Sequence, residues 1–587
     1  MNVSAPTSRP ASSEAASPNR KSRPWIPVAL LALFALQSLW FIGTQSLTYD
    51  EPGHIIAGLD AWQHGRFEMW TDHPPLGHFW LTLPLARAHV EIEQQELPRG
   101  YRVTAMQPGP EWLAWHTRPM NTLLGIALGL TLWFATRRLF SEGAANVALA
   151  LFAFTPSLIA NFSVTTTDGI GALFVFLTAY QLVRWRRTPA GCPRFASRFW
   201  TLTWVRRKTQ VSPKDGRTWG TVLDTGFDQT VLMGLVLGGA LLAKLYTPPE
   251  VLLALVLMLF LRRDGWNSLR TLNWKPTLAA LGIALLTFWA GYLFHVSHLS
   301  VGNGQVVATF PNRPTKTWAT KAETELNLLL PAGEYVEGFR NVAISSHRGR
   351  PAWFLGSLYR QGGPKIYYPV AIALKWPTIL LLLFFGSLFL GVRKTCRAPS
   401  DLLVISLFSL VFFAFALQSH FDIGERHILP LYAFALLIAG GIWEHARKNR
   451  AAMVIVILAL LLNAADALRY APDYLAYYNV PVRPQTSWYL LTDSNLDWGQ
   501  GLIALRNYEQ QHPGETLYLA YFGSVDPSLY GVRAIPLAPN QPVKGTVVAG
   551  ASCLSGQVLD DPEGYRWLWP YPPRQILDHS MWVFDTR

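Results

Sequence analysis

Residues 25–43 read WIPVALLALFALQSLWFIG and contain no charged side chain. A helix of about 20 apolar residues crosses the roughly 30 Å hydrocarbon core of a bilayer. No small-x-small cleavage site follows this run before Tyr49 and Asp50, so we predict a retained signal anchor and not a cleaved secretory signal. The run therefore predicts a first transmembrane helix.

Apolar runs of this kind recur along most of the 587-residue chain. The composition is 50% hydrophobic and only 15% charged, against about 25% charged in an ordinary soluble chain. These values exclude a soluble enzyme, a fibrous protein and a disordered tail protein. We predict a mostly α-helical, polytopic integral membrane protein with about eleven transmembrane helices. The predicted spans are 25–43, 119–136, 143–161, 168–183, 229–244, 246–261, 277–295, 367–391, 401–418, 427–443 and 451–466.

The net charge of +13 follows this topology. In a soluble protein such an excess would favour nucleic-acid binding. With the N-terminus in the cytoplasm, the basic groups Arg137-Arg138, Arg262-Arg263 and Arg393-Lys394 all fall on the cytoplasmic side, where membrane proteins concentrate Lys and Arg. We therefore predict a protein of the inner or plasma membrane with an extracytoplasmic C-terminus and no nucleic-acid partner.

The connecting segments suggest three parts. Residues 1–24, rich in Ser, Pro and Ala, predict a disordered cytoplasmic tail. Residues 25–466 predict the transmembrane domain, with exported loops at 44–118 and 299–366 and a basic cytoplasmic loop at 184–228. Loops well beyond about 15 residues are usually functional, so we expect the chemistry on the outer face.

Residues 467–587 predict a small exported α/β domain. Alternating apolar residues indicate strands, and helical spacing of apolar residues indicates one helix. The expected elements are strands at 488–492, 516–522, 546–549 and 581–584 and a helix at 499–511.

Polar residues at membrane level are costly and therefore mark candidate sites. Asp50 and Glu51, directly after the first span, are adjacent carboxylates suited to a general base or a divalent cation. The alternative is a solvated turn made by Pro52 and Gly53.

A second cluster, Asp72-His73, lies just before two prolines. With His54 it offers oxygen and nitrogen ligands suited to Mg²⁺, Mn²⁺ or Zn²⁺. The alternative is a proline-rich entry into an interfacial helix, and the spacing matches no strong metal signature.

Two further features lie at the outer ends of spans. Asp168 opens the fourth span, where its simplest role is that of an N-cap, a role compatible with facing a cavity. Lys244, Lys375, Arg426 and His427 are basic residues at the same level. If they face one cavity, they would bind the phosphate of a lipid-linked substrate, although Lys244 and Arg426 would also be explained by snorkelling to headgroups.

Acids and cations at one outer face suit the displacement of a lipid-linked phosphate by an acceptor hydroxyl. One carboxylate would accept the hydroxyl proton, while the cations, with or without a metal, would stabilise the departing phosphate. No glycine-rich loop for binding a nucleotide phosphate occurs in the sequence.

Several motifs stand in a recognisable order between residue 25 and the C-terminus. They are Asp50-Glu51, HPPLG at 73–77, Thr166-Thr167-Asp168, YYPVAIALKWP at 367–377, IGERHILP at 423–430 and DSNLDWGQ at 493–500. Their order resembles the GT-C glycosyltransferases, in the branch of the protein O-mannosyltransferases and the aminoarabinose transferase of bacterial lipid A.

The resemblance implies an enzyme that transfers a sugar from a polyprenyl-phosphate donor, with inversion, to a lipid, protein or glycan acceptor. It implies Asp50 as the catalytic base beside Glu51, and Asp168 as a second acid that orients the acceptor or a metal. His73, Arg426 and Lys375 would lie near the donor phosphate, although His73 stands where some members have a lysine.

Two other classes of function remain open. A transporter or flippase of polyprenyl-linked material would also need many spans and outward cations, but the chain shows no inverted hydropathy repeat. A non-catalytic cell-envelope assembly protein would bind polymers through 467–587. There Asp493, Asn495, Asp497 and Trp498 would contact a sugar, or would simply form a turn around a packed tryptophan.

Overall fold

Each apolar run that predicts a span is helical in the structure. The computed structural model describes residues 24–587 apart from 68, 98–99, 188–228, 263–264, 267–271, 303–304 and 310–325. The predicted tail at 1–24, except for its last residue, and most of the basic loop at 184–228 lie outside the described residues. The helices at the predicted spans are α1 (Trp25–Thr44), α4 (Pro110–Leu139), α5 (Glu142–Ala153), α6 (Pro156–Asn161), α7 (Asp168–Arg186), α9 (Gln229–Ala243), α10 (Pro248–Phe260), α11 (Trp274–Gly291), α13 (Tyr367–Lys375), α14 (Thr378–Phe389), α16 (Pro399–Ala416), α17 (Pro430–Gly440) and α19 (Arg450–Leu468).

The long helices are apolar enough for a bilayer. Of the described helices, α1, α4, α16 and α19 are long and apolar enough to span one, and the bent pair α13–α14 adds a fifth span if it is counted as one. Shorter apolar helices, α5, α9 and α10, complete the bundle. The chain is therefore a mostly helical membrane protein, as predicted, although fewer than eleven helices qualify by length and composition.

Prolines divide two of the predicted spans into shorter helices. A proline has no backbone N–H to continue a helix and disfavours helical geometry in the residue before it. Pro156 accordingly begins α6 after the end of α5. Pro377 separates α13 from α14, and the chain bends by 111° between these two helices. These breaks place polar residues near the outer end of the bundle.

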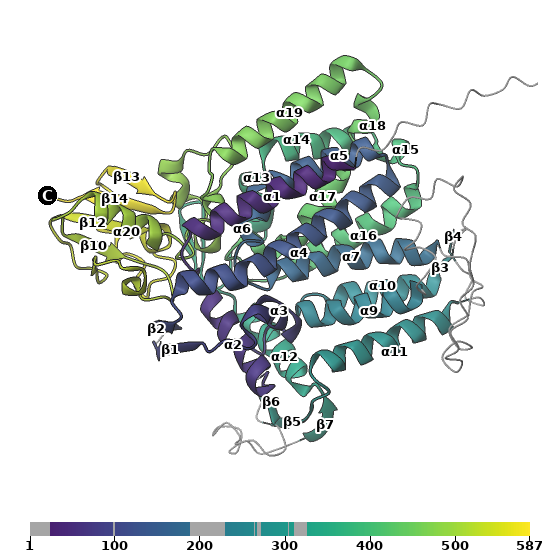
Figure 1. The fold of residues 1–587 in the computed structure, drawn as a ribbon, viewed down its shortest axis with the longest axis horizontal. Helices are drawn as coiled ribbons and strands as arrows, with labels where there is room; N and C mark the ends of the chain where they lie inside the picture. The colour runs from purple at the N-terminus through teal and green to yellow at the C-terminus, as the bar shows by residue number, and fades with distance from the viewer. Residues whose placement is uncertain are drawn as a thin grey trace, which may run out of the picture.

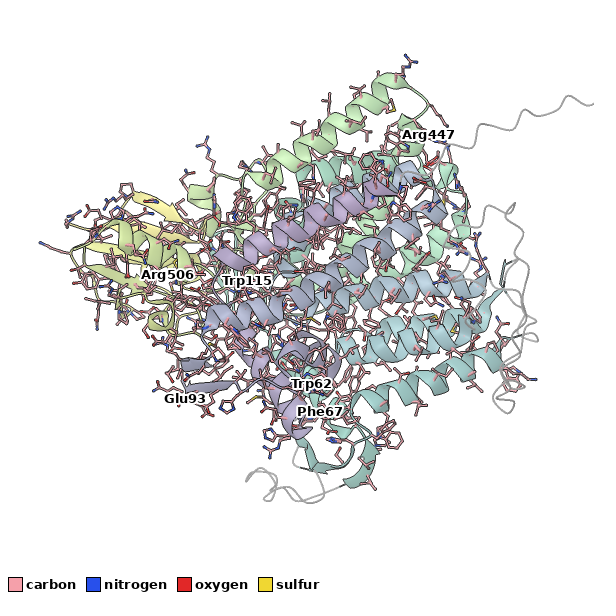
Figure 2. All side chains as sticks on the ribbon, in the orientation of Figure 1. Trp62, Phe67, Glu93, Trp115, Arg447 and Arg506 are labelled. Atoms are coloured by element: carbon pink, nitrogen blue, oxygen red, sulfur yellow. The ribbon has the colours of Figure 1, made fainter. Side chains whose placement is uncertain are left out.

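The smaller elements of the loops predicted to be exported gather at one end of the helices, where the C-terminal part also lies (Figure 1). Figure 2 shows Glu93 and Arg506 at this end and Arg447 at the opposite end. The end with Glu93 and Arg506 corresponds to the predicted outer side, and the end with Arg447 to the predicted cytoplasmic side. The exported elements before the C-terminal part are α2 (Glu51–His64), α3 (Pro75–Leu81), β1 (Glu91–Glu96), β2 (Tyr101–Gln107), β5 (Val296–Gly302), β6 (Gln305–Thr309), β7 (Leu326–Pro331), α12 (Gly333–Arg348), β8 (Ala352–Phe354) and β9 (Ser357–Tyr359).

The C-terminal part contains the predicted small α/β arrangement. Its sheet has the order β11-β10-β12-β14-β13. The central strand β12 pairs in parallel with β10 and antiparallel with β14, and all of its residues are buried. The elements are α20 (Leu502–Gln511), β10 (Leu517–Ala520), β11 (Ile535–Pro536), β12 (Thr546–Gly550), β13 (Pro573–Leu577) and β14 (Met581–Asp585).

The prediction of a strand at 488–492 is wrong. Residues Pro484–Tyr489 form a 3-10 helix instead. The carbonyls of Tyr489 and Leu490 accept hydrogen bonds from Trp353 Nε1 and Leu355 N, at 3.1 and 2.8 Å. The segment therefore packs against the β8–β9 region and does not join the sheet.

Backbone hydrogen bonds join the C-terminal part to the start of the first exported loop. Tyr49 N donates to Trp498 O at 2.9 Å, and Val103 N donates to Ser524 O at 2.7 Å. Ser46 N likewise donates to Gln500 O at 2.8 Å. The DSNLDWGQ segment at 493–500 is thus held directly beside Asp50.

Candidate functional site

A cavity of about 1580 Å³ lies where the loops predicted to be exported and the C-terminal part meet the ends of the helices. Its walls come from the first exported loop, from α12 and α16, from the 349–360 loop region and from the C-terminal part. Asp50, Asp72, Lys244, Arg426 and Asp493 all line it. The cavity therefore brings together residues that are far apart in the sequence.

Four charged side chains alternate in a row at this cavity. Arg426 Nη1 lies 2.7 Å from Asp50 Oδ2 and 3.6 Å from Asp168 Oδ2. Lys244 Nζ lies 2.8 Å from Asp168 Oδ1. Asp168 is fully buried, and Lys244 and Arg426 are nearly so. Two predicted acids and two predicted cations thus form one network, which we call the acid–cation row.

Helix ends position the two acids. Asp50 directly precedes α2, whose first turn contains Pro52. Asp168 is the first residue of α7, after the N-cap residue Thr167, so the predicted N-cap role of Asp168 is not found. Its carboxylate is bound by the two cations, and the helix N-terminus further favours a negative charge there.

Packing on the C-terminal segment positions Arg426. The guanidinium carbon lies 4.0 Å from the centre of the Trp498 ring, a cation–π contact. A Cβ at Gly424 would lie 2.0 Å from Ser494 Oγ, so a larger residue there would require the Ser494 side chain to move. Trp498 therefore does more than fill a turn, and the sequence offered no signal that it would lie under Arg426.

His73 extends the row through Thr167. Lys244 Nζ donates to Thr167 Oγ1 at 2.8 Å, and Thr167 Oγ1 lies 3.0 Å from His73 Nδ1. Burial lowers the pKa of His73 well below its usual value, and the charge of Lys244 lowers it further. His73 is therefore neutral at pH 7 and acts as a hydrogen-bonding residue, not as a cation.

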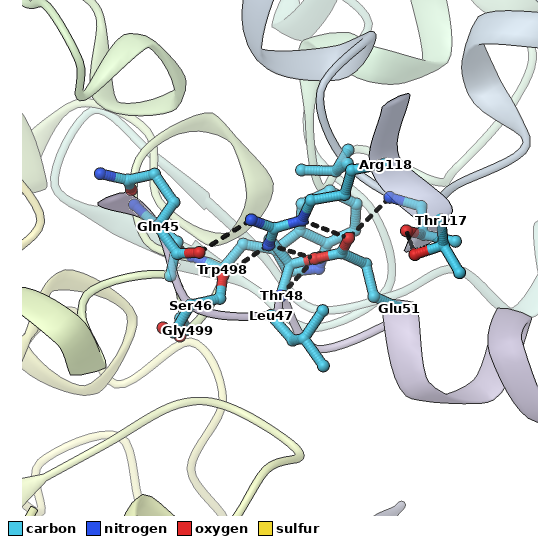
Figure 3. Close-up of polar contacts among 12 residues, drawn as sticks. Gln45, Ser46, Leu47, Thr48, Glu51, Thr117, Arg118, Trp498 and Gly499 are labelled. Carbon is cyan, nitrogen blue, oxygen red and sulfur yellow. Dashed lines mark hydrogen bonds and ion pairs between the residues drawn. The ribbon is translucent and has the colours of Figure 1, made fainter. Parts of the chain in front are cut away.

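Glu51 does not line the cavity, and Figure 3 shows its carboxylate bound by Arg118. It is fully buried, and Arg118 binds its two oxygens at 2.9 and 2.8 Å. The backbone amides of Thr48 and Thr165 donate to the same carboxylate at 2.7 and 2.6 Å. Burial raises the pKa of Glu51, but Arg118 and these hydrogen bonds outweigh it and lower the pKa overall. The structure thus places Glu51 in a buried ion pair beside the site.

Lys375 also lies away from the cavity. It is fully buried, and Nζ donates to the carbonyls of Leu475, Tyr477 and Asn495. Glu425 Oε1 lies 3.8 Å away. These partners occupy all three N–H groups of the ammonium, so Lys375 has none left for a phosphate.

His427 lines the cavity beside Arg426. Its ring stacks on Phe421 with the ring centres 6.1 Å apart. Its Nε2 atom is buried and has no hydrogen-bond partner within the described part of the chain. His427 thus remains available to a ligand.

The residues predicted for a metal do not fit one. His54 Nδ1 lies 3.0 Å from His78 Nε2, and His73 Nδ1 is bonded to Thr167. Asp72 Oδ2 is 3.9 Å from His73. Among the residues that the structure describes, no group of three or more His, Cys, Asp or Glu side chains comes together as a metal site. The predicted Mg²⁺, Mn²⁺ or Zn²⁺ site at Asp72, His73 and His54 is therefore not supported.

The chain is similar in structure to several solved proteins. No protein-family model and no curated protein sequence matches it. The structure of ArnT from Cupriavidus metallidurans bound to undecaprenyl phosphate overlaps 95% of this chain and 97% of that one, at 13% identity and a TM-score of 0.45. The S. cerevisiae protein O-mannosyltransferase Pmt1-Pmt2 complex, bound to its sugar donor, overlaps 76% and 90%, at 11% identity and a TM-score of 0.47.

A third similar structure is the oligosaccharyltransferase AglB from Archaeoglobus fulgidus, in complex with an inhibitory peptide and a dolichol-phosphate. It overlaps 91% of this chain and 70% of that one, at 12% identity and a TM-score of 0.40. A protein O-mannosyltransferase, one of the enzymes that the motifs resemble, is thus among the similar structures. We therefore infer the chemistry of this chain from the residues of its own site.

Proposed function

We propose that this protein is a membrane glycosyltransferase that moves a sugar from a polyprenyl-phosphate donor to an acceptor hydroxyl, with inversion. The acid–cation row at one large cavity is the observation that carries the proposal. We place the cavity on the extracytoplasmic side of the inner or plasma membrane, with the N-terminus in the cytoplasm, because Arg447 and the basic helix Val392–Thr395 lie at the other end of the molecule.

The two cations suit the charge that develops on the leaving group. A polyprenyl-phosphate sugar is a phosphodiester with one negative charge, and the departing polyprenyl phosphate carries a second. Arg426 and Lys244, nearly buried at the cavity wall, would stabilise that added charge in a site where water is scarce. His427 would add a hydrogen bond to the same phosphate.

Asp50 is the better placed of the two acids to act as the base. Its side chain is 22% exposed, whereas that of Asp168 is 1% exposed and is held by both cations. The acceptor oxygen bonds to the anomeric carbon as the bond from that carbon to the phosphate oxygen breaks, and the hydroxyl proton passes to Asp50. Asp168 holds the two cations in place.

The contact between Asp50 and Arg426 makes the availability of the base depend on the bound donor. Arg426 Nη1 lies 2.7 Å from the oxygen that would accept the proton. A donor phosphate would compete with Asp50 for that guanidinium and so free the carboxylate. The base is then fully available only when the donor is bound.

An apolar part of the wall suits the lipid portion of the donor. Leu245, Phe339, Phe412 and Phe415 line the cavity near the membrane helices. Ligand pockets are lined mainly by such side chains, with a few polar groups that fix orientation. The wall thus offers a polyprenyl chain an apolar path toward the phosphate-binding cations.

The proposal is tested with the purified protein in nanodiscs and a panel of polyprenyl-phosphate sugars. We expect one donor to release free polyprenyl phosphate, and Asp50→Asn to lower the rate by roughly 10²- to 10⁴-fold because a general base is lost. Asp60→Asn is the matched control, since Asp60 lies on the same helix α2 and bonds to His64 at 3.0 Å. No Asp50-dependent release from any donor, with folded protein, would point to a transporter or an assembly protein.

A further inference from the structure

The segment 493–500 of the C-terminal part contacts two other motifs of the sequence and the chain just before Asp50. The proposed reaction uses none of its side chains. Its residues are buried except Asp493, which is partly exposed at the cavity wall. The segment would therefore affect the reaction through the residues that it holds in place.

Asn495 holds the backbone directly before Arg426. Its Oδ1 atom accepts from Glu425 N at 3.0 Å, and its Nδ2 atom donates to Tyr367 Oη at 2.9 Å. Nδ2 also donates to Thr492 O at 3.0 Å. Asn495 is fully buried, where an amide without these partners would be costly. The bonds therefore fix the point of the backbone from which the Arg426 side chain extends.

Lys375 anchors Asn495 through its backbone. Lys375 Nζ donates to Asn495 O at 2.5 Å and lies 3.8 Å from Glu425 Oε1. Glu425 in turn accepts from Ser157 Oγ at 2.5 Å and from Tyr432 Oη at 2.7 Å. A buried ammonium is tolerated only when its donors and its charge are paired. Lys375 therefore holds the segment 493–500 against Glu425.

The ring of Trp498 holds the side chain of Arg426. The ring centre lies 4.0 Å from the guanidinium carbon, and Trp498 is 1% exposed. Because buried side chains are closely packed, the ring limits the directions in which the guanidinium can turn. Arg426 Nη1 consequently stays between the carboxylates of Asp50 and Asp168, at 2.7 and 3.6 Å.

The backbone of Trp498 holds the chain next to Asp50. Trp498 O accepts from Tyr49 N at 2.9 Å, one residue before Asp50. Ser46 Oγ donates to Gly499 O at 3.0 Å, and Figure 3 shows Trp498 and Gly499 beside residues 45–48. One residue thus contacts both the Arg426 side chain and the chain that carries Asp50.

The C-terminal sheet supports this segment through Ser552, which lies in the short helix α21 (Ala551–Leu554) directly after β12. Ser552 N donates to Asp497 Oδ2 at 3.0 Å, and Ser552 Oγ donates to Asp497 O at 2.8 Å. Asp493 N donates to the same Oγ at 3.0 Å. The segment is therefore fixed to the sheet on one side and to the acid–cation row on the other.

We propose that Asn495 and Trp498 are positioning residues that set the distance between the base Asp50 and the phosphate-binding Arg426. The inference rests on the proposed function, from which it takes the roles of Asp50 and Arg426. The base must meet the acceptor hydroxyl while the guanidinium meets the phosphate oxygen that leaves the anomeric carbon, and small errors in such an alignment are costly. Asp50 and Arg426 are 376 positions apart in the sequence, so a segment that contacts both sides is needed to align them.

The test is a double-mutant cycle on the purified full chain in phosphatidylcholine nanodiscs. The variants are Trp498→Leu, Arg426→Gln and the two together, and the readout is the release of polyprenyl phosphate from the donor panel. We expect Trp498→Leu to lower the rate roughly 10- to 100-fold. In the Arg426→Gln background the same change should have little further effect, because Trp498 acts through Arg426.

Two further variants complete the cycle. Trp498→Phe keeps an aromatic face under the guanidinium and should recover most of the rate lost in Trp498→Leu. Asn495→Ala removes the acceptor of Glu425 N, and its effect should also largely disappear in the Arg426→Gln background.

Trp567→Leu is the matched control, because Trp567 is a partly buried tryptophan of the same C-terminal part that does not line the cavity. Its effect should add to that of Arg426→Gln, as for independent sites. A buried tryptophan that only stabilised the fold would behave in the same way. Additive effects of Trp498→Leu or Asn495→Ala with Arg426→Gln, or no recovery in folded Trp498→Phe, would overturn the inference.

The two proposals fail in different ways. If release depends on Asp50 but the effects are additive, the positioning inference is wrong and the glycosyltransferase proposal stands. If no donor is cleaved, the same cycle is measured on binding of radiolabelled polyprenyl phosphate, which needs Arg426 but no reaction. Non-additive losses of binding would then support the positioning of Arg426 while the glycosyltransferase proposal is wrong, and additive losses or unchanged binding would overturn both.

Discussion

At the scale of single residues, two adjacent carboxylates have different surroundings. Asp50 lines the cavity and accepts a hydrogen bond from Arg426, whereas Glu51 is buried against Arg118. Arg118 also donates to the carbonyls of Gln45 and Ser46, at 2.7 Å each. The Glu51–Arg118 pair therefore holds the chain just before Asp50, and its role is structural.

Glu51→Gln should destabilise the protein, because it leaves the buried guanidinium of Arg118 without its counter-charge. Breaking one partner of a buried ion pair costs about 3–5 kcal/mol, so we expect a clear drop in melting temperature in detergent. Asp50→Asn, at a partly exposed position, should lower the melting temperature much less while it lowers donor cleavage by roughly 10²- to 10⁴-fold. Equal melting temperatures for Glu51→Gln and the unchanged protein would show that the pair does not support the fold.

Asp493 should make stability depend on pH. Burial raises the pKa of Asp493 to about 7, while Arg426 and Arg350 lower it and Asp50 raises it. A raised pKa in the folded state means that folding retains a proton which the unfolded chain releases near pH 4. Stability should therefore fall as the pH rises from about 4 to about 7, and then level off.

The measurement is the melting temperature between pH 5 and pH 8, for the unchanged protein and for Asp493→Asn. The variant retains an oxygen that can accept from Ser494 N, as Asp493 Oδ1 does at 2.6 Å, and should show a flatter profile. Each pKa unit corresponds to about 1.4 kcal/mol, and partial exposure to the cavity should reduce the slope below that value. Identical profiles for both proteins would remove Asp493 as the source.

At the scale of elements, hydropathy predicted the helices well and their partners poorly. Runs of apolar residues determine where a span lies, so each predicted span coincides with one or more helices. The bend between α13 and α14 places Lys375 against carbonyls of residues 475–495. A sequence shows how deep a lysine lies but not which acceptors reach it, which is why Lys375 was predicted to bind phosphate.

The C-terminal elements also show that a sequence predicts elements better than their partners. Strands β10, β12 and β14 have strongly apolar sequences and were predicted, whereas β11 and β13 are edge strands that contain prolines and exposed residues. Residues 488–492 have a strand-like sequence, yet their carbonyls bond to the β8–β9 region. Hydrogen bonding to a distant segment determines the structure of these residues, and their local sequence pattern does not predict that pairing.

At the scale of the whole molecule, the site exists only because distant segments meet. Asp50 and Arg426 are 376 positions apart in the sequence, and Lys244 and Asp168 are 76 apart. The sequence placed all four at the outer face, but not which of them would pair.

The orientation of the molecule can be tested at its two ends. Figure 2 places Glu93 and Arg506 at one end of the helices and Arg447 at the other. We expect cysteines introduced at Glu93 and Arg506, in a protein without its three native cysteines, to react with a membrane-impermeant maleimide on intact cells or right-side-out spheroplasts. A cysteine at Arg447 should react only after permeabilisation, because basic cytoplasmic loops fix the topology. The opposite pattern would put the acid–cation row at the cytoplasmic face, where the donor sugar would have to be presented from inside, and would overturn the extracytoplasmic reaction.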